Sequence, residues 1–137
     1  MEHKILIIDD SEDDILLTQM VLAKMRLEIR TESALSGEKG LALLKGGGPL
    51  PSLVLLDLKM PGRDGLDVLR EIRSDDRLRG IPVIVVTHSE LESDREACYD
   101  ADANGFLHKS VDLDRFSAEI RKALEKWMKP ASSGSMG

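Results

Sequence analysis

The sequence predicts an α/β domain built on a doubly wound, five-stranded parallel sheet with helices on both faces. Three short aliphatic runs, 5–8, 53–56 and 81–86, lack the polar–apolar alternation of a half-exposed strand, which is typical of strands covered on both faces. Amphipathic stretches separate these runs, so strands and helices alternate along the chain. In such a fold, functional groups gather at the carboxyl ends of the strands.

Two weaker runs complete the five strands, and five stretches have helical spacing. The weaker strands are expected at 27–31 and 103–108, and the helices at 14–26, 37–45, 64–74, 90–101 and 112–128. Ser11 and Ser36 stand where helix N-caps are expected. The segments 45–52 and 75–80 are turns between a helix and the next strand, because glycine and proline end helices.

Size and composition limit the function classes. The chain has 137 residues, which fits one domain, and its net charge of −6 argues against a nucleic-acid partner. The single cysteine, Cys98, indicates a reducing compartment, and no run of apolar residues is long enough for a signal peptide or a membrane helix. We therefore expect a cytoplasmic domain over 1–129, without membrane contact, and a disordered tail over 130–137, where the periodicity is lost.

Polar residues follow four of the five predicted strands, including all three strong ones. They are Asp9 and Asp10 after the first, Asp57 after the third, Thr87 after the fourth and Lys109 after the fifth. Three carboxylates at one edge of a sheet would not all stay ionised without a cation. Their oxygen ligands suit Mg²⁺, whereas zinc prefers nitrogen or sulfur.

The same edge predicts phosphoryl chemistry. A carboxylate such as Asp57 can form an acyl phosphate, and the Thr87 hydroxyl and Lys109 ammonium would stabilise charge on the phosphoryl oxygens. A less specific interpretation treats Asp9 and Asp10, followed by Glu12, Asp13 and Asp14, only as a solvated acidic helix start, favoured by the helix dipole. Their combination with Asp57, Thr87 and Lys109 makes the phosphoryl site the better hypothesis.

Four motifs, "IIDD", "LLDLKMPGRDG", "VIVVT" and "GFLHK", resemble the receiver domain of bacterial two-component response regulators. The resemblance spans about residues 3–128, and the four motifs agree with that family in order and spacing. It implies a flavodoxin-like sheet with strand order 2-1-3-4-5, aspartyl phosphorylation by a histidine kinase, and readout by conformational change. Because no output domain fits in the chain, it looks like a stand-alone receiver.

The resemblance also implies a role for each site residue. Asp57 corresponds to the phosphoacceptor, and Asp10, Asp57 and the backbone carbonyl of Lys59 correspond to Mg²⁺ ligands, with Asp9 assisting through water. Thr87 and Lys109 correspond to the phosphoryl partners. Phe106 corresponds to an aromatic residue whose rotamer accompanies activation, although an aromatic residue in a strand is just as readily explained as core.

Partners are implied in the same way. The extended turns "GGGPLPS" and "DDRLRG" resemble those of the phytochrome-linked group, which implies a phytochrome-like histidine kinase as partner. The face formed by residues 90–128 resembles the one through which many receivers form homodimers. Charged residues there are candidates for ion pairs: Asp94, Arg95, Asp100, Arg115, Glu119 and Lys122.

Two positions depart from the family pattern. Ser110 follows Lys109 where receivers usually have a proline after a cis peptide bond; we expect a trans bond here, because a cis non-proline bond costs about 2.5–4 kcal/mol. His88, after Thr87, is larger than the usual small residue. It is a candidate for shielding Asp57 from water and altering the lifetime of the phosphoryl group.

Three other functions compete with the receiver. A haloacid dehalogenase-type phosphatase also uses an aspartyl nucleophile with Mg²⁺, but it needs an acid two residues later, where this chain has Lys59. A degenerate receiver acting only as an interaction module would have lost part of the acid, threonine and lysine set. A nucleotide-binding domain is disfavoured because neither GxxxxGK nor GxGxxG follows the first strand.

Overall fold

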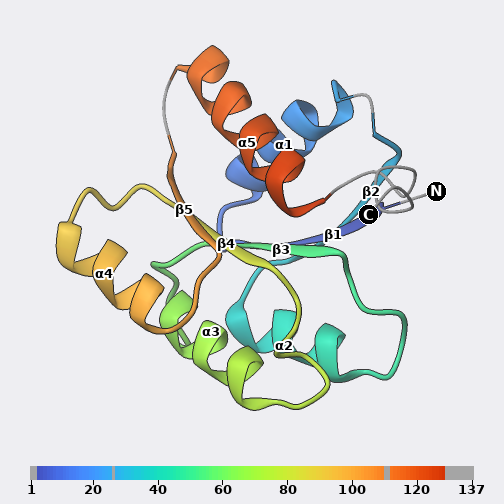
Figure 1. Ribbon diagram of the computed structural model, residues 1–137, viewed down its shortest axis with the longest axis vertical. Coiled ribbons are helices and arrows are strands. Elements are labelled where there is room, and N and C mark those ends of the chain that lie inside the picture. The colour runs from blue at the N-terminus through green and yellow to red at the C-terminus, as the bar shows by residue number, and fades with distance from the viewer. Residues whose placement is uncertain (1–2, 26, 110–111, 129–137) are drawn as a thin grey trace.

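The computed structural model describes residues 3–25, 27–109 and 112–128, in which strands and helices alternate (Figure 1). In chain order the elements are β1 (His3–Ile8), α1 (Glu12–Ala23), β2 (Ile29–Ala34), α2 (Gly37–Lys45), β3 (Leu53–Leu56), α3 (Gly65–Ser74), β4 (Val83–Thr87), α4 (Glu92–Asp100), β5 (Gly105–His108) and α5 (Leu113–Trp127).

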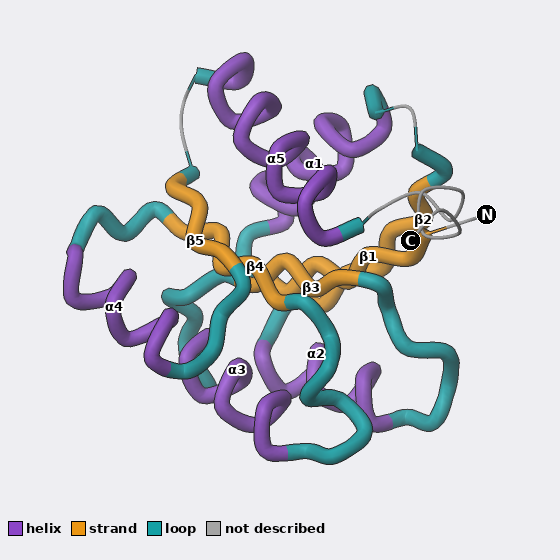
Figure 2. Tube along the Cα trace, in the orientation of Figure 1, coloured by secondary structure: helices purple, strands orange, loops and turns teal. Residues whose placement is uncertain are grey.

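The sheet has the order β2-β1-β3-β4-β5, and each pair of neighbouring strands is parallel. Helices α1 and α5 cover one face of the sheet, and α2, α3 and α4 cover the other (Figure 2). The doubly wound α/β fold and its 2-1-3-4-5 order are therefore confirmed. With this order, the carboxyl ends of β1, β3, β4 and β5 lie next to one another.

Two hydrophobic clusters fill the space between the sheet and its helices. In β1, Leu6 and Ile8 belong to the cluster under α2 and α3, whereas Ile5 and Ile7 belong to the cluster under α1 and α5. All four side chains are buried. The strand is aliphatic at successive positions because successive side chains enter different cores.

Most element boundaries lie within two or three residues of those predicted. The caps are confirmed: the Ser11 hydroxyl accepts a hydrogen bond from the Asp14 amide at 3.2 Å, and that of Ser36 accepts one from the Lys39 amide at 3.1 Å. The largest differences, of three residues, are at the end of α1, predicted at 26 and observed at Ala23, and at the end of β2, predicted at 31 and observed at Ala34. As an edge strand β2 pairs only with β1, and partly exposed polar residues are tolerated there.

Two sequence predictions fall outside the described residues: the tail at 130–137 and the peptide bond between Lys109 and Ser110. Among the residues that are described, none of the helices is both long and apolar enough to cross a membrane.

Candidate functional site

The polar residues predicted at the strand ends are positioned by the sheet itself. Asp57 directly follows β3, and its amide donates a hydrogen bond to the Ile8 carbonyl of β1 at 2.9 Å. On the other side, the Lys109 amide donates to the carbonyl of Thr87 at 2.7 Å. Residues separated by up to a hundred positions are thus fixed at one edge by backbone pairing.

The loop after Asp57 is shaped by two glycines. Gly62 has a φ of 75°, a left-handed conformation that glycine adopts without strain. Gly65 opens α3 so close to the strand end that a Cβ atom there would lie 2.1 Å from the Asp57 carbonyl oxygen. Met60, in the same loop, is buried in the core. The loop is therefore packed against the strand end that carries Asp57.

Three acids gather at this edge of the sheet. One carboxylate oxygen from each of Asp9, Asp10 and Asp57 lies within 4.8 Å of the other two. Asp9 and Asp57 are buried, whereas Asp10 is exposed. Burial raises the pKa of Asp57 to about 6; the Lys109 ammonium opposes this rise, and the charges of Asp9 and Asp10 add to it.

Lys109 is buried among carboxylates. Its Nζ donates hydrogen bonds to Oδ2 of Asp9 at 2.6 Å and to Oδ2 of Asp14 at 3.0 Å, and it lies 3.4 Å from Oδ2 of Asp57. Burial alone would lower the pKa of this ammonium, but its hydrogen bonds to Asp9 and Asp14 and the charge of Asp57 raise it. Lys109 therefore stays charged and partly compensates the acidic cluster.

The two oxygens of Asp9 are already engaged. Oδ1 accepts a hydrogen bond from the Ser11 amide at 3.0 Å, and Oδ2 accepts the bond from Lys109. The exposed carboxylate of Asp10 is the more accessible of the pair. The donor set is all oxygen, carries more negative than positive charge, and so fits a hard divalent cation.

Thr87 ends β4 and is 1% exposed. Its Oγ1 accepts a hydrogen bond from the Ser89 amide at 3.2 Å, which leaves the hydroxyl proton free to be donated. His88 is turned toward α1, where its Nε2 lies 3.2 Å from Oδ2 of Asp14, and it remains largely exposed. The shielding of Asp57 by His88 stays a prediction.

The side chain of Lys59 is directed to helix α4. Its Nζ lies 3.3 Å from Oδ2 of Asp94, which also accepts a hydrogen bond from the Ser89 hydroxyl. Only the backbone carbonyl of Lys59 remains as a candidate metal ligand. Asp94 was one of the expected charges of the 90–128 face, but it pairs within the domain.

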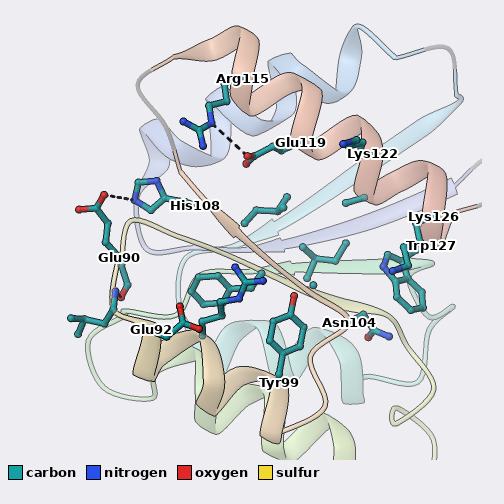
Figure 3. A pocket seen from close by; sticks show the side chains of 18 residues that line it. Glu90, Glu92, Tyr99, Asn104, His108, Arg115, Glu119, Lys122, Lys126 and Trp127 are labelled. Carbon is teal, nitrogen blue, oxygen red and sulfur yellow. Dashed lines mark hydrogen bonds and ion pairs between the residues drawn. The ribbon is translucent and has the colours of Figure 1, made fainter.

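Phe106 is in β5, two positions before His108. It is half-buried, packs against the core under α2, α3 and α4, and lines a groove between α4, β5 and α5 (Figure 3). Both the core interpretation and a change of rotamer are compatible with this environment.

One residue of the site was missed from the sequence. Asp14 was interpreted only as a residue of an acidic helix start, yet it shares Lys109 with Asp9 and Asp57. The signal was its spacing: Asp14 stands on the first turn of α1, and helical side chains point back toward the N-terminus, here toward the site.

Comparison with known proteins identifies relatives of this chain and its fold. The chain is 34% identical over 129 residues to the response regulator Rcp1 of Synechocystis sp., covering 90% of this chain and 88% of Rcp1. It is 30% identical over 125 residues to the polar-differentiation response regulator DivK of Brucella anthropi, covering 90% of this chain and 98% of DivK.

Solved structures agree. The phosphorylated cyanobacterial phytochrome response regulator RcpA superimposes with a TM-score of 0.87 at 32% identity, covering 94% of this chain and 96% of RcpA. The Mn²⁺-bound form of Rcp1 gives a TM-score of 0.83 at 33% identity, covering 94% of this chain and 96% of that one. The family model described as "Response regulator receiver domain" matches residues 5–121. Fold, site and relatives together show that this chain belongs to the response regulator receiver domain family.

Proposed function

We propose that this receiver domain accepts a phosphoryl group on the Asp57 carboxylate from a histidine kinase, in a reaction that depends on Mg²⁺, and relays the signal by a change of conformation. The observation that carries the proposal is the set of three charged neighbours around Asp57. One carboxylate oxygen of Asp9 and one of Asp10 lie within 4.8 Å of an oxygen of Asp57, and Lys109 Nζ lies 3.4 Å from Oδ2 of Asp57.

The reaction is a phosphoryl transfer between two side chains. An Asp57 oxygen forms a bond to phosphorus as the bond between phosphorus and the imidazole nitrogen of the donor histidine breaks. The Lys109 ammonium and the Thr87 hydroxyl would donate to the oxygens of the transferred group. Because both residues are buried and held by the backbone pairing of β4 and β5, they need little reorganisation.

We assign the metal site to the Asp10 and Asp57 carboxylates and the Lys59 backbone carbonyl, with Asp9 acting through water. The two hydrogen bonds that Asp9 already accepts support this division. When bound, Mg²⁺ would supply positive charge that offsets the repulsion between the carboxylates and the incoming phosphoryl group.

Phosphorylation of Asp57 could also change the conformation of the surface formed by α4, β5 and α5. We propose that a change in the rotamer of Phe106 accompanies phosphorylation, because this residue of β5, two positions before His108, lines the groove between α4, β5 and α5. Phe106 is half-buried and packs against the core under α2, α3 and α4, so the proposed rotamer change would alter both the core contact and the groove.

A phytochrome-like histidine kinase is the partner we propose, acting in the cytoplasm. RcpA is described as a phytochrome response regulator, and its identity to this chain is 32%. The single cysteine, Cys98, is a buried free thiol, which suits a reducing compartment.

We further propose that two copies associate through the face formed by residues 90–128. The groove there is lined by apolar and charged side chains, including Leu91, Tyr99 and Trp127 (Figure 3). Leu91 is 61% exposed and Tyr99 is 42% exposed. Of the charged residues expected to pair there, Arg115 and Glu119 lie 3.6 Å apart within α5. Sedimentation at several protein concentrations, with and without a phosphodonor, tests this association; a monomer under all conditions contradicts it.

The phosphatase alternative is not favoured by the geometry. Its second acid would have to stand at position 59, which is an exposed lysine paired with Asp94. A degenerate receiver is equally disfavoured, since the acids, Thr87 and Lys109 are all present at the strand ends.

Intact-mass measurement tests the proposal. The protein is incubated with acetyl phosphate and Mg²⁺, beside the Asp57→Ala variant. We expect one added phosphoryl group in the parent and none in the variant, and no continuing hydrolysis of unrelated phosphoesters. Equal incorporation in Asp57→Ala, or multiple turnover of such esters, would refute the assignment.

A further inference from the structure

We propose that Asp14, on the first turn of α1, is a positioning residue for Lys109. Its carboxylate holds the lysine ammonium so that one N–H of that ammonium stays on the side of Asp57. The inference rests on the proposed function, because Lys109 matters to phosphoryl transfer only if Asp57 is the acceptor.

The contacts of Lys109 are unequal. Its Nζ donates to Asp9 at 2.6 Å and to Asp14 at 3.0 Å, but lies at 3.4 Å from Oδ2 of Asp57, which is an ion-pair distance. An ammonium has three N–H groups in a tetrahedral arrangement. When two of them are committed to Asp9 and Asp14, the third is the one left for Asp57 or for a group bound to it.

Asp14 is itself held in place. Its amide donates to the Ser11 hydroxyl at 3.2 Å, and its carbonyl accepts a hydrogen bond from the Thr18 hydroxyl at 2.9 Å. From the loop after β4, His88 Nε2 lies 3.2 Å from the same carboxylate oxygen that binds Lys109. The Asp14 carboxylate is therefore held by two side chains, Lys109 and His88.

The neighbouring acids of the same helix do not share this environment. Glu12 and Asp13 are exposed, whereas the side chain of Asp14 is 25% exposed. Burial alone would raise the pKa of Asp14, but the hydrogen bond and charge of Lys109, followed by those of His88, lower it. A solvated residue at a helix start would have neither the contacts nor the burial.

Asp14 also stands outside the acidic cluster. Asp9 belongs both to the Lys109 contacts and to the group of three carboxylates that could hold a cation, whereas Asp14 does not belong to that group. If a bound cation attracts the Asp9 carboxylate, Asp14 is the remaining carboxylate that holds the Lys109 ammonium in place. Its function is thus distinct from metal binding.

The test compares Asp14→Ala with Asp13→Ala, which removes the same charge from the same turn. Phosphorylation by acetyl phosphate with Mg²⁺ is followed by intact mass over a range of donor concentrations. We expect the maximal rate to fall roughly tenfold in Asp14→Ala, since misplacing a group that stabilises the transition state is costly, and to stay within about twofold in Asp13→Ala. Asp14→Asn, which keeps an acceptor oxygen, should fall in between.

The half-saturating donor concentration should not change, because Asp14 does not lie among the groups proposed to contact the donor. A general loss of structure would alter both quantities. If Asp14→Ala does not fold, the comparison passes to Asp14→Asn and Asp13→Asn.

A second readout is independent of phosphorylation. In protein labelled with ¹⁵N-lysine, the buried Lys109 ammonium should give a slowly exchanging NMR signal, assigned by its loss in Lys109→Met. We expect this signal to shift or broaden in Asp14→Ala and not in Asp13→Ala. An unchanged signal, or an Asp14→Ala rate within about twofold of Asp13→Ala, overturns the inference. If the parent itself takes up no phosphoryl group, the proposed function fails, and the ammonium signal alone decides whether Asp14 positions Lys109.

Discussion

The Lys109 ammonium lies 3.4 Å from the Asp57 carboxylate, and both side chains are almost fully buried. The lysine also serves Asp9 and Asp14, so one cation faces three acids. The site therefore retains excess negative charge until a metal binds, and this imbalance has measurable consequences.

Replacing the acceptor should stabilise the fold at neutral pH. Burial holds the Asp57 pKa at about 6, above its ordinary value of 3.8. The stability that this group contributes is therefore complete below about pH 4 and is lost as the pH rises through about 6. We expect Asp57→Asn to unfold with a free energy about 1–3 kcal/mol above that of the parent at pH 7.5 without metal.

The gap between the two proteins should close as the pH falls toward 4, and Mg²⁺ should stabilise the parent more than the variant. Urea denaturation at several pH values measures both effects. Asp76→Asn is the control, because its side chain is 96% exposed. If the parent is as stable as Asp57→Asn at pH 7.5, the ionised Asp57 carboxylate does not destabilise the fold, and the prediction is wrong.

Removing the cation should have the opposite effect. Lys109→Met leaves three carboxylates without their partner, and we expect a loss of about 3 kcal/mol in unfolding free energy at pH 7.5 without metal. Mg²⁺ should restore part of it, since a bound cation replaces the missing charge. The control Lys59→Met breaks an exposed ion pair with Asp94 and should cost at most about 1 kcal/mol. Equal losses in the two variants would contradict the central place of Lys109.

The close approach of the α3 start to the strand end predicts an effect of a single methyl group. A Cβ at position 65 would lie 2.1 Å from the Asp57 carbonyl oxygen. Relieving this clash would require a shift of the backbone, which costs more free energy than moving a flexible side chain. We expect Gly65→Ala to lose about 2–4 kcal/mol of stability and to accept phosphoryl groups more slowly. The matched control is Gly80→Ala, where nothing lies within 4 Å. Thermal unfolding and intact mass measure the two effects, and an unaffected Gly65→Ala would show that the loop is not tightly packed.

The Arg73 guanidinium connects α3 to the segments that precede β4 and β5. Arg73 donates hydrogen bonds to four acceptors: the carbonyls of Asp102, Arg79 and Ile81 and the side-chain oxygen of Asn104. A lysine ammonium cannot span them, because it lacks the planar fork of donors. We expect Arg73→Lys to lose about 2 kcal/mol of stability, whereas Arg70→Lys, at an exposed position of α3, should be neutral. Equal denaturation midpoints for the two variants would refute this role.

The sheet and the residues at its strand ends could be predicted from the sequence, because a buried strand appears as a short aliphatic run and a polar residue follows it directly. Leu53 to Leu56 and the following Asp57 are an example: the run fixes the strand, and parallel pairing fixes the edge at which Asp57 emerges. The bounds of edge strand β2 were shifted by two residues at its start and three at its end, since its polar residues have no such pattern.

Side-chain partners were harder to predict. Its spacing places Asp14 on the first turn of α1, but the contact with Lys109, 95 positions later, also depends on the rotation of α1 against the sheet and on rotamers, which local sequence does not encode. The pairing of Lys59 with Asp94 has the same origin, because it joins the loop after β3 to α4.

A crystal structure of the protein with Mg²⁺ and beryllofluoride, a stable mimic of an acyl phosphate, tests the central claim most directly. We predict beryllium bonded to an Asp57 oxygen, with the Lys109 ammonium and the Thr87 hydroxyl within hydrogen-bond distance of its fluorides. Beryllofluoride on another carboxylate, or a lysine and threonine beyond its reach, would contradict the account.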